Sequence, residues 1–437
     1  MKQLRLLIVK MIRFILVQFH RGGSLPGKIA LRLDPLILTR FKTPEILVIV
    51  TGTNGKTSTS NLIVESLSAS GLKVIGNRKG DNLREGIATL LCANSDYSYK
   101  IKADAVVLEV DEMSIPRVFN QLSVSSFVIT NFFRDQLDRA GEMETILRKI
   151  ESVLPEYKGN LILNGNDPNV MRVGDVAKLA TLHTFAVERT ADSKNTSNEA
   201  SEGKFCPRCK KELVYDYYQY SHIGKFYCEH DNFGQIEPTV LVNAIDYERQ
   251  EFMVDGVSYP SFQNAIYAIY NCCAVLCLLK TLSIPLRYAS KVFKEFELND
   301  GRNESFVING SPCLLNLIKN PTGANEVMKG IIRDSNKKAI LIVLNDRDQD
   351  GCDVSWIWDT HFELLFNDSL ELVLCSGLRA NDMGLRLKYL DHTTNIHVEE
   401  GLDEAIKRLS QCNASLYVLS TYTALQPVRA ALRRVSE

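Results

Sequence analysis

Short apolar runs alternate with helical patterns over the first part of the chain. Such runs predict strands, and their alternation with helices predicts βαβ units, whose parallel sheet is covered on both faces. Helices are expected after Lys56, near 83–93 and near 142–154. The expected strands are EILVIVT (45–51), LKVIG (72–76), ADAVVLEV (103–110), SSFVITN (125–131) and GNLILN (159–164).

A polar segment, VERTADSKNTSNEASEG (187–203), then predicts a surface linker that leads into an inserted module. A hairpin-like segment (239–259) and helices at 263–283 and 286–296 follow. From about residue 300 a second α/β pattern begins, with strands expected at 312–318, 338–344, 371–375 and 415–419. The predicted organisation is a lead-in segment (1–44), a first α/β domain (45–300) with an insertion (204–234), and a C-terminal α/β domain (301–437).

The composition is that of an ordinary soluble globular protein, with 45% hydrophobic and 24% charged residues. The net charge of -1 provides no global field that would recruit nucleic acid or anionic lipid. The eleven cysteines are too few for a disulfide scaffold in a chain of this length. Cys272, Cys273 and Cys277 lie in apolar runs and are expected to be buried thiols, which indicates a reducing cytoplasm.

The N-terminal stretch MKQLRLLIVKMIRFILVQFHRGG (1–23) predicts an amphipathic helix. Lys10 and Arg13 interrupt its apolar residues, so it fits neither a membrane span nor a signal peptide. It is expected either to pack on the first domain or to contact a membrane surface peripherally. Its apolar residues at helical spacing are Leu6, Leu7, Met11, Phe14, Ile15 and Phe19.

The stretch GTNGKT, between an apolar strand and a helix, predicts a phosphate-binding loop. Gly52 and Gly55 permit a tight turn with amide hydrogens directed at phosphate, Lys56 reaches the terminal phosphates, and the Thr57 hydroxyl can ligate Mg²⁺. Val50 stands where the full motif has its first glycine, so an incidental glycine turn is the alternative. The expected nucleotide-binding residues here are Gly52, Thr53, Asn54, Gly55, Lys56 and Thr57.

These residues resemble the phosphate loop of the Mur ligase superfamily, whose members use ATP to convert a carboxylate into an acyl phosphate. The resemblance implies a Mg²⁺ site on Thr57 and Glu109, an approach of Asn271 to adenine, and an approach of Arg302 to the phosphates. It also implies a P-loop central domain. The further matching positions, in order along the chain, are Glu109, Asn131, Asp135, Asp138, Asn164, Asn166, Asp167, Asn271 and Arg302.

Two positions depart from the family pattern. Gln136 stands where the family has a histidine that helps to hold a second Mg²⁺. Lys149 is the nearest match to the family's carbamylated lysine, but it is out of register. The resemblance therefore implies one Mg²⁺ site and leaves a second open.

The insertion carries Cys206, Cys209 and Cys228 at the spacing of a zinc ribbon. Asp231 occupies the position of the usual fourth cysteine. His230, Asp231 or His222 could supply the fourth ligand. The sequence thus predicts a structural zinc ion, the alternative being a ribbon that has lost its metal.

The run LNDRDQDGCDVSWIWDTHFE (344–363) is dense in carboxylates and holds both tryptophans of the chain, Trp356 and Trp358. Carboxylates on a loop often form a capping turn, but the two tryptophans favour a packed, specific surface. The pattern is similar to the C-terminal domain of the MurT family, and the cysteine ribbon fits the same family. The resemblance therefore covers almost the whole chain.

The MurT resemblance implies a specific activity. MurT proteins pair with a glutaminase-type subunit, GatD, and amidate the α-carboxylate of D-glutamate in the stem peptide of lipid II. ATP and Mg²⁺ would form the acyl phosphate, with Lys56 and Arg302 neutralising charge at the transferring group. Asp353 matches the aspartate thought to complete the partner's Cys–His pair, with Asp350 and Asp359 as further candidates.

The cysteines supply an independent check on the nitrogen source. Glutaminases of the GatD kind present their nucleophile on a G-x-C-x-G elbow, and none of the eleven cysteines has that setting. The nitrogen must then come from ammonia, an amino acid or another chain. Two alternative functions stay open: a stand-alone ligase that joins an amino acid to a carboxylate, and a nucleotide-binding scaffold without chemistry.

Overall fold

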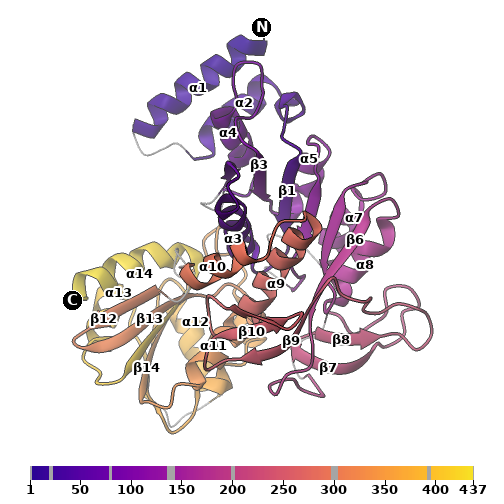
Figure 1. Ribbon diagram of the computed structural model, residues 1–437. Coiled ribbons are helices and arrows are strands. Elements are labelled where there is room, and N and C mark those ends of the chain that lie inside the picture. The colour runs from indigo at the N-terminus through magenta and orange to yellow at the C-terminus, as the bar shows by residue number, and fades with distance from the viewer. Residues whose placement is uncertain are drawn as a thin grey trace. The chain divides into compact units, whose positions relative to one another are not determined.

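The computed structural model describes residues 2–18, 23–77, 81–134, 143–197, 202–296, 304–390 and 395–436 (Figure 1). These residues form two compact units. One unit lies within Met1–Phe133 and Met143–Phe296, and the other within Arg134–Glu142 and Glu297–Glu437.

The described part of the first unit contains a 9-stranded sheet in the order β11-β10-β9-β6-β5-β4-β1-β3-β2. The strands from β2 to β9 in this order are parallel to their neighbours, and β10 and β11 continue the sheet antiparallel. This confirms the predicted βαβ pattern. The strands are β1 (Ile46–Thr51), β2 (Val74–Gly76), β3 (Ala105–Glu109), β4 (Ser126–Ile129), β5 (Asn160–Asn164), β6 (Thr181–Val187), β9 (Val240–Asp246), β10 (Glu251–Val254) and β11 (Val257–Pro260).

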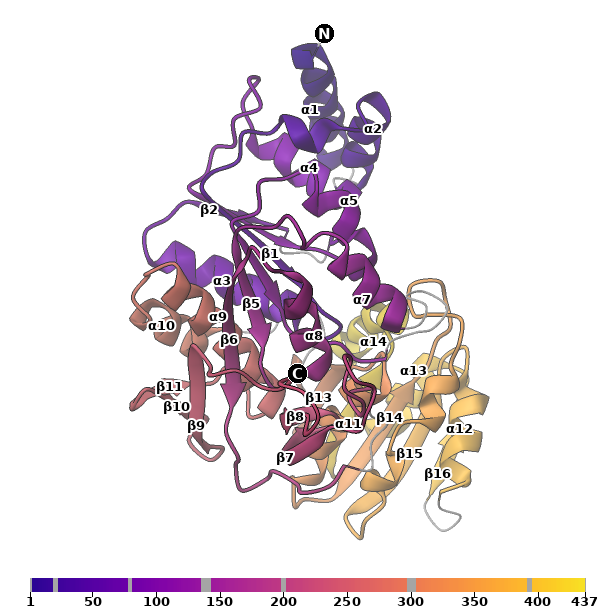
Figure 2. The same ribbon diagram turned by 90° about the vertical axis from the view of Figure 1, so that its right-hand side faces the viewer.

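Helices cover both faces of this sheet, with α3, α9 and α10 on one face and α5, α7 and α8 on the other (Figure 2). Helix α9 is buried almost all round, and its Cys272, Cys273 and Cys277 have no exposed surface, as predicted. The helices are α3 (Lys56–Ala69), α4 (Arg84–Asn94), α5 (Ile115–Phe119), α7 (Met143–Glu151), α8 (Pro168–Val176), α9 (Ile266–Thr281) and α10 (Arg287–Glu295).

The predicted N-terminal helix is present as α1 (Lys2–Gln18), which packs on α2 (Leu25–Leu33) and α4. Leu6 and Val9 form the packed face and are buried. Most of the predicted apolar residues instead face outward, and Phe14 is 70% exposed. Phe19 lies outside the described residues. Across the described chain, every helix is too short or too polar to cross a membrane.

The inserted module contains a separate antiparallel hairpin, β7 (Val214–Tyr220) and β8 (Ile223–Tyr227). In Figures 1 and 2 this hairpin lies close to α8. Its strands are the aromatic-rich segments of the cysteine insertion, and they pair with each other rather than with the large sheet.

The second unit contains a 6-stranded sheet in the order β12-β13-β17-β14-β15-β16, parallel except for the edge strand β12. The chain runs outward from β14 through β15 to β16 and then returns to β17 beside β14. The order reverses between β14 and β17, which is where open α/β sheets hold ligands. The elements are β12 (Glu304–Ile308), β13 (Ser311–Leu317), β14 (Lys338–Val343), β15 (Leu370–Ser376), β16 (Ile396–Val398), β17 (Ser415–Ser420), α11 (Pro321–Ile332), α12 (Ala380–Lys388), α13 (Leu402–Leu409) and α14 (Tyr422–Val435).

Candidate nucleotide and metal sites

The predicted phosphate loop joins the end of β1 to the start of α3. Its two glycines have positive φ, 128° at Gly52 and 83° at Gly55. A Cβ on Gly52 would lie 2.3 Å from Oγ1 of Thr130, and a Cβ on Gly55 would lie 2.3 Å from Oδ1 of Asn271. Both positions therefore require glycine, for conformation and for space.

A second segment fixes the shape of this loop. Oδ1 of Asn131 accepts a hydrogen bond from the Asn54 amide at 2.9 Å, and Nδ2 of Asn131 donates to the Asn54 carbonyl at 3.0 Å. The Thr53 amide donates to the Asn131 carbonyl at 2.8 Å. The residue that the sequence matched to a family motif thus braces the phosphate loop directly.

Lys56 lies at the start of α3 and is only 8% exposed. Its Nζ donates to Oε1 of Glu112 at 2.8 Å and to the Gly52 carbonyl. Burial alone would lower the pKa of Lys56, but the charge and hydrogen bond of Glu112 outweigh it and raise the pKa above its usual value. Lys56 is therefore a buried cation at the phosphate loop, balanced by a carboxylate that the sequence reading did not single out.

Glu109 ends β3 beside Thr57 and is 2% exposed. Its Oε1 accepts hydrogen bonds from Oγ1 of Thr57 and Nδ2 of Asn82, each at 3.1 Å. Asn77 bonds both its backbone amide and its carbonyl, at 2.8 and 2.7 Å. Oε2 of Glu109 is buried and has no hydrogen-bond partner among the described residues. A hydroxyl and an unsatisfied buried carboxylate oxygen are the hard donors that Mg²⁺ prefers, so these residues fit the predicted ion.

Two further predicted residues of this region, Asn271 and Lys149, are described, and four others are not. Asn271 on α9 lies against Gly55 and is thus placed at the phosphate loop. The Nζ atom of Lys149 lies 3.5 Å from Sδ of Met113, one residue from Glu112. The predicted residues that lie outside the described part of the chain are Arg302, Asp135, Gln136 and Asp138.

The inserted module brings four potential metal ligands together. The ligand atoms of Cys206, Cys209, Cys228 and Asp231 all lie within 4.8 Å of one another. Three thiols and a carboxylate are a donor set that suits tetrahedral zinc. His230 is not in this group, because its Nδ1 lies 3.3 Å from Nζ of Lys211 on the exposed surface. His222 is fully buried at the opposite end of the hairpin and is not in the group either.

The three aspartates considered in the C-terminal unit have different surroundings. Asp350 is 3% exposed, and its carboxylate accepts hydrogen bonds from the Thr423 amide at 2.7 Å and from the Thr423 hydroxyl. Asp353 accepts a hydrogen bond from the Ser355 amide at 2.8 Å, and this bond lowers the pKa of the Asp353 carboxyl. The side chain of Asp359 is 47% exposed. Asp350 thus holds the loop in place, whereas Asp353 and Asp359 remain accessible.

The two tryptophans next to these aspartates also differ. Trp356 is buried in the core of the unit, while Trp358 is 49% exposed. Trp358 packs edge-on against the exposed Tyr389 at 5.6 Å, and the Arg386 guanidinium lies over its ring at 5.3 Å. Exposed Trp and Tyr with an adjacent Arg are the residue types that dominate protein interfaces.

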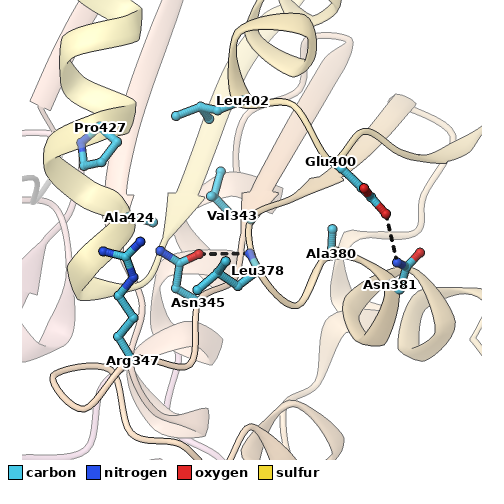
Figure 3. Close-up of a pocket in the computed structure, with 11 residues that line it drawn as sticks. Val343, Asn345, Arg347, Leu378, Ala380, Asn381, Glu400, Leu402, Ala424 and Pro427 are labelled. Carbon is cyan, nitrogen blue, oxygen red and sulfur yellow. Dashed lines mark hydrogen bonds between the residues drawn. The ribbon is translucent and has the colours of Figure 1, made fainter.

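An open pocket of about 480 Å³ lies at the carboxyl ends of β14 and β15 (Figure 3). Asn345 lies at its base, and its Oδ1 accepts a hydrogen bond from the Leu378 amide at 3.0 Å. Arg347 and Glu400 give the walls charges of both signs. Ala424 and Pro427 of α14, which follows β17, also line the pocket. The pocket therefore extends to the position where the strand order reverses, and the sheet offers a second place that can hold a small polar group.

The fold and the phosphate loop place the chain among the Mur ligases. The Mur ligase middle domain matches residues 50–228. The structure is similar to that of a pseudomurein peptide ligase type C from Methanothermus fervidus, with a TM-score of 0.71 and 19% identity, covering 91% of this chain and 80% of that one.

The C-terminal unit narrows this class, because the MurT ligase C-terminal model matches residues 317–425. The lipid II isoglutaminyl synthase (glutamine-hydrolyzing) subunit MurT of Staphylococcus aureus (strain COL) is 31% identical over 95% of this chain and 94% of its own length. The protein of the same name from Streptococcus pneumoniae (strain ATCC BAA-255 / R6) is 32% identical over 98% of this chain and 96% of its own length. The chain belongs to the MurT family.

Proposed function

We propose that this chain is the ATP-dependent ligase subunit that amidates the α-carboxylate of D-glutamate in the lipid II stem peptide, giving D-isoglutamine. The arrangement of Lys56, Thr57 and Glu109 around the phosphate loop carries the proposal, because it combines a buried cation with an unsatisfied buried carboxylate oxygen. The names of the family members quoted above supply the substrate and the product.

The reaction has two steps, formation of an acyl phosphate and its displacement by ammonia. A carboxylate oxygen of D-glutamate attacks the γ-phosphorus of ATP, and the bond between the γ-phosphorus and the bridging oxygen of ADP breaks. Ammonia then attacks the acyl carbon, loses a proton, and displaces inorganic phosphate, which retains one oxygen of the original carboxylate. Mg²⁺ held by Thr57 and Glu109 would neutralise phosphate charge. Lys56 stabilises the transferring phosphoryl group once phosphate replaces Glu112 as its partner, and Arg302 is proposed to act with it.

The ammonia comes from a glutaminase subunit of the GatD type. Cys352 is the exposed one among the eleven cysteines, and the other ten are buried or partly buried. Cys352 follows Gly351 on the aspartate-rich loop rather than on a strand–helix elbow. The exposed Trp358 and Tyr389 and the accessible Asp353 form the surface on which the partner docks, with Asp353 orienting the partner's catalytic histidine.

The ribbon binds one structural Zn²⁺ through Cys206, Cys209, Cys228 and Asp231. The ligand atoms already converge, and a ribbon site with four protein ligands leaves no open position for catalysis. Metal analysis of the purified chain should find one zinc per chain, and Asp231→Ala should lower that content. Full retention of zinc by Asp231→Ala would exclude Asp231 as a ligand.

We propose that the exposed side of α1 holds the chain, in the cytoplasm, at the inner face of the membrane. Met11, Phe14 and Ile15 are 58, 70 and 54% exposed, and such apolar side chains on a basic amphipathic helix insert into the headgroup region. Within residues 1–44, Asp34 is the single acidic residue, and the basic residues are Lys2, Arg5, Lys10, Arg13, Arg21, Lys28, Arg32, Arg40 and Lys42.

This contact can be tested with vesicles. The parent chain should co-sediment with anionic vesicles and not with neutral ones, and Phe14→Glu should abolish the binding. Leu179, which is 50% exposed elsewhere in the first unit, offers a matched control, since Leu179→Glu should bind like the parent. Equal loss in both variants, or no vesicle binding by the parent, would contradict the membrane contact.

The main proposal is tested with the purified chain alone, supplied with ATP, Mg²⁺, ammonium and a D-glutamate-containing stem peptide. We expect product with the mass change for replacing a hydroxyl by an amino group, and an equal amount of ADP. Addition of a whole residue when amino acids are supplied would instead identify a stand-alone ligase. Nucleotide binding without product, even after GatD is added, would identify a scaffold.

A further inference from the structure

The turn of the ribbon hairpin is buried, although the tip of an inserted hairpin normally faces solvent. We call residues 220–223 the ribbon tip. Tyr220 and Ser221 are 5 and 2% exposed, and His222 and Ile223 have no exposed surface. The tip is therefore packed into the first unit, at the end of the hairpin opposite the metal ligands.

The ribbon tip packs against the segments that follow β4 and β5. The His222 ring lies 4.8 Å from the ring of Phe133, which follows β4, and its Nε2 lies 3.4 Å from Oδ1 of Asp167, which follows β5. Oδ2 of Asp167 in turn accepts a hydrogen bond from the Phe132 amide at 2.8 Å. Glu202 faces the other ring nitrogen of His222 at 3.7 Å. The tip thus closes the space between two strand ends.

Phe133 connects the ribbon tip to the phosphate loop. The Phe133 amide donates to Oγ1 of Thr53 at 3.0 Å, and the Thr53 hydroxyl lies 3.2 Å from the Phe133 carbonyl. The ring of Tyr220 stacks on the ring of Phe133 at 5.8 Å. One short series of contacts therefore leads from the tip to Thr53 of the phosphate loop.

A second series of contacts leads from the tip to the other end of the loop, at Gly55. The ring of Tyr220 packs on that of Tyr270 at 5.9 Å, and the hydroxyl of Tyr270 donates to Asn166 at 2.9 Å. The next residue, Asn271, lies against Gly55 at the end of the phosphate loop. Tyr220 thus supports both the residue that bonds Thr53 and the helix that bounds Gly55.

The metal ligands lie at the other end of the same hairpin. Strand β8 begins at the tip with Ile223 and ends at Tyr227, directly before Cys228. The Cys228 amide donates to the Phe233 carbonyl at 2.8 Å, and the ring of Phe226 packs on that of Phe233 at 5.6 Å. The tip anchors one end of the hairpin in the first unit, and a metal bound by Cys228 and its neighbours would hold the other end together.

We propose that the ribbon tip is a positioning element of the nucleotide site, and that metal bound at the far end of the ribbon sustains nucleotide affinity through it. Tyr220 is the central residue, since its ring contacts both Phe133 and Tyr270. The proposal rests on nucleotide binding by the phosphate loop. Failure of the parent chain to bind nucleotide would therefore defeat the proposed function itself, before the ribbon is tested.

The test measures the Kd of the full-length chain for ATP with Mg²⁺ by calorimetry, at a temperature where each variant is folded. Tyr220→Leu removes two ring contacts and should raise the Kd about tenfold. Tyr220→Phe keeps the ring contacts with Phe133 and Tyr270, and this variant should bind ATP nearly as the parent does. Lys225→Ala alters an exposed residue of β8 that pairs with Asp216 at 3.1 Å, and it should leave the Kd unchanged.

A folded Tyr220→Leu chain with parent affinity would overturn the role of the tip, and so would an equal effect of Lys225→Ala. Should Tyr220→Leu fail to fold, His222→Gln is measured in the same way with the same expected direction and the same overturning result. A stabilising residue without a positioning role would lower the melting temperature and leave the Kd of the folded chain at its parent value.

The role of the metal is tested with Cys209→Ser, and the zinc content is measured on the same sample. Loss of zinc should raise the Kd for ATP. Adding Cys209→Ser to Tyr220→Leu should raise the Kd for ATP little further, because both changes act through the same contacts. Loss of zinc with unchanged Kd, or full additivity of the two changes, would overturn the coupling between metal and nucleotide.

Discussion

The phosphate loop and the aspartate-rich loop of the C-terminal unit both gather charged side chains, but in opposite environments. At the phosphate loop, Lys56, Glu109 and Glu112 are each at most 8% exposed. Lys56 donates to Glu112, and Glu109 accepts from Thr57, the residue after Lys56. On the C-terminal loop, Asp353 uses one oxygen to accept from Ser355 and is accessible. This difference agrees with the proposal that small ligands complete the enclosed site and that another protein completes the accessible one.

The largest expected effect comes from removing the cation of the enclosed site. Lys56→Ala should reduce ATP-dependent amidation about 1,000-fold, because no other described side chain takes its place at the loop. The measurement is ADP release with ammonium as nitrogen source. Co-purification with GatD should be unchanged, and an ADP rate equal to the parent's would refute the phosphate-loop assignment.

A change at the accessible Asp353 should impair amidation with one nitrogen source only. Asp353→Asn should lower glutamine-driven amidation about 100-fold or more, since a histidine without its carboxylate partner loses its tautomer and cation stabilisation. Ammonium-driven amidation should stay at the parent rate. Equal loss with both nitrogen sources would mean that Asp353 acts elsewhere.

Glu112→Gln tests the ion pair of the enclosed site. Removing one member of a buried pair should lower the free energy of unfolding by about 3 kcal/mol, because the Lys56 charge stays buried. ATP with Mg²⁺ should raise the melting temperature more in this variant than in the parent, since phosphate supplies the missing charge. An identical thermal shift in both would contradict the idea that Glu112 and phosphate share Lys56.

Asp350→Asn separates support of the C-terminal loop from chemistry. Its carboxylate accepts from Thr423 at a buried position, so the change should cost about 2 kcal/mol of stability. Amidation of the folded variant should fall by the same factor with glutamine and with ammonium. A selective loss with glutamine would move the role proposed for Asp353 to Asp350.

The smallest effect concerns pH. The Ser355 amide holds the pKa of Asp353 below its usual value, so the carboxylate is ionised at neutral pH, and the stability it contributes is lost only as pH falls through that lowered pKa. The ratio of glutamine-driven to ammonium-driven rates should therefore show no Asp353 titration above about pH 5. An acidic limb that disappears in Asp353→Asn would contradict this.

Much of the fold followed from pattern, because buried parallel strands are continuous apolar runs. The strands that were missed lack such runs: β6 begins with exposed residues, β12 is a partly exposed edge strand, and β16 spans 3 residues. The spacing of apolar residues correctly predicts the helix α1, but it does not show which side of the helix packs on the rest of the unit. Leu6 and Val9 pack, while Phe14 faces outward.

The sites divided in the same way. Residues within or next to a motif, such as Lys56, Thr57 and Asn131, could be predicted, since the motif fixes their geometry. Glu112, Asn77 and Asn82 could not, because tertiary contacts bring them to the loop. Whether Asp231 or His230 lies with the three cysteines likewise depends on the turn after Cys228, and sequence spacing left this position open.

The most direct measurement follows the oxygen atoms of the substrate. The stem peptide, labelled with ¹⁸O in the α-carboxylate of D-glutamate, is incubated with the purified chain, ATP, Mg²⁺ and ammonium, and the released phosphate is analysed by mass spectrometry. If this chain activates the acid as an acyl phosphate, one labelled oxygen should pass to phosphate for each amide formed. Unlabelled phosphate alongside amide product would contradict activation of the acid by the phosphate-loop site.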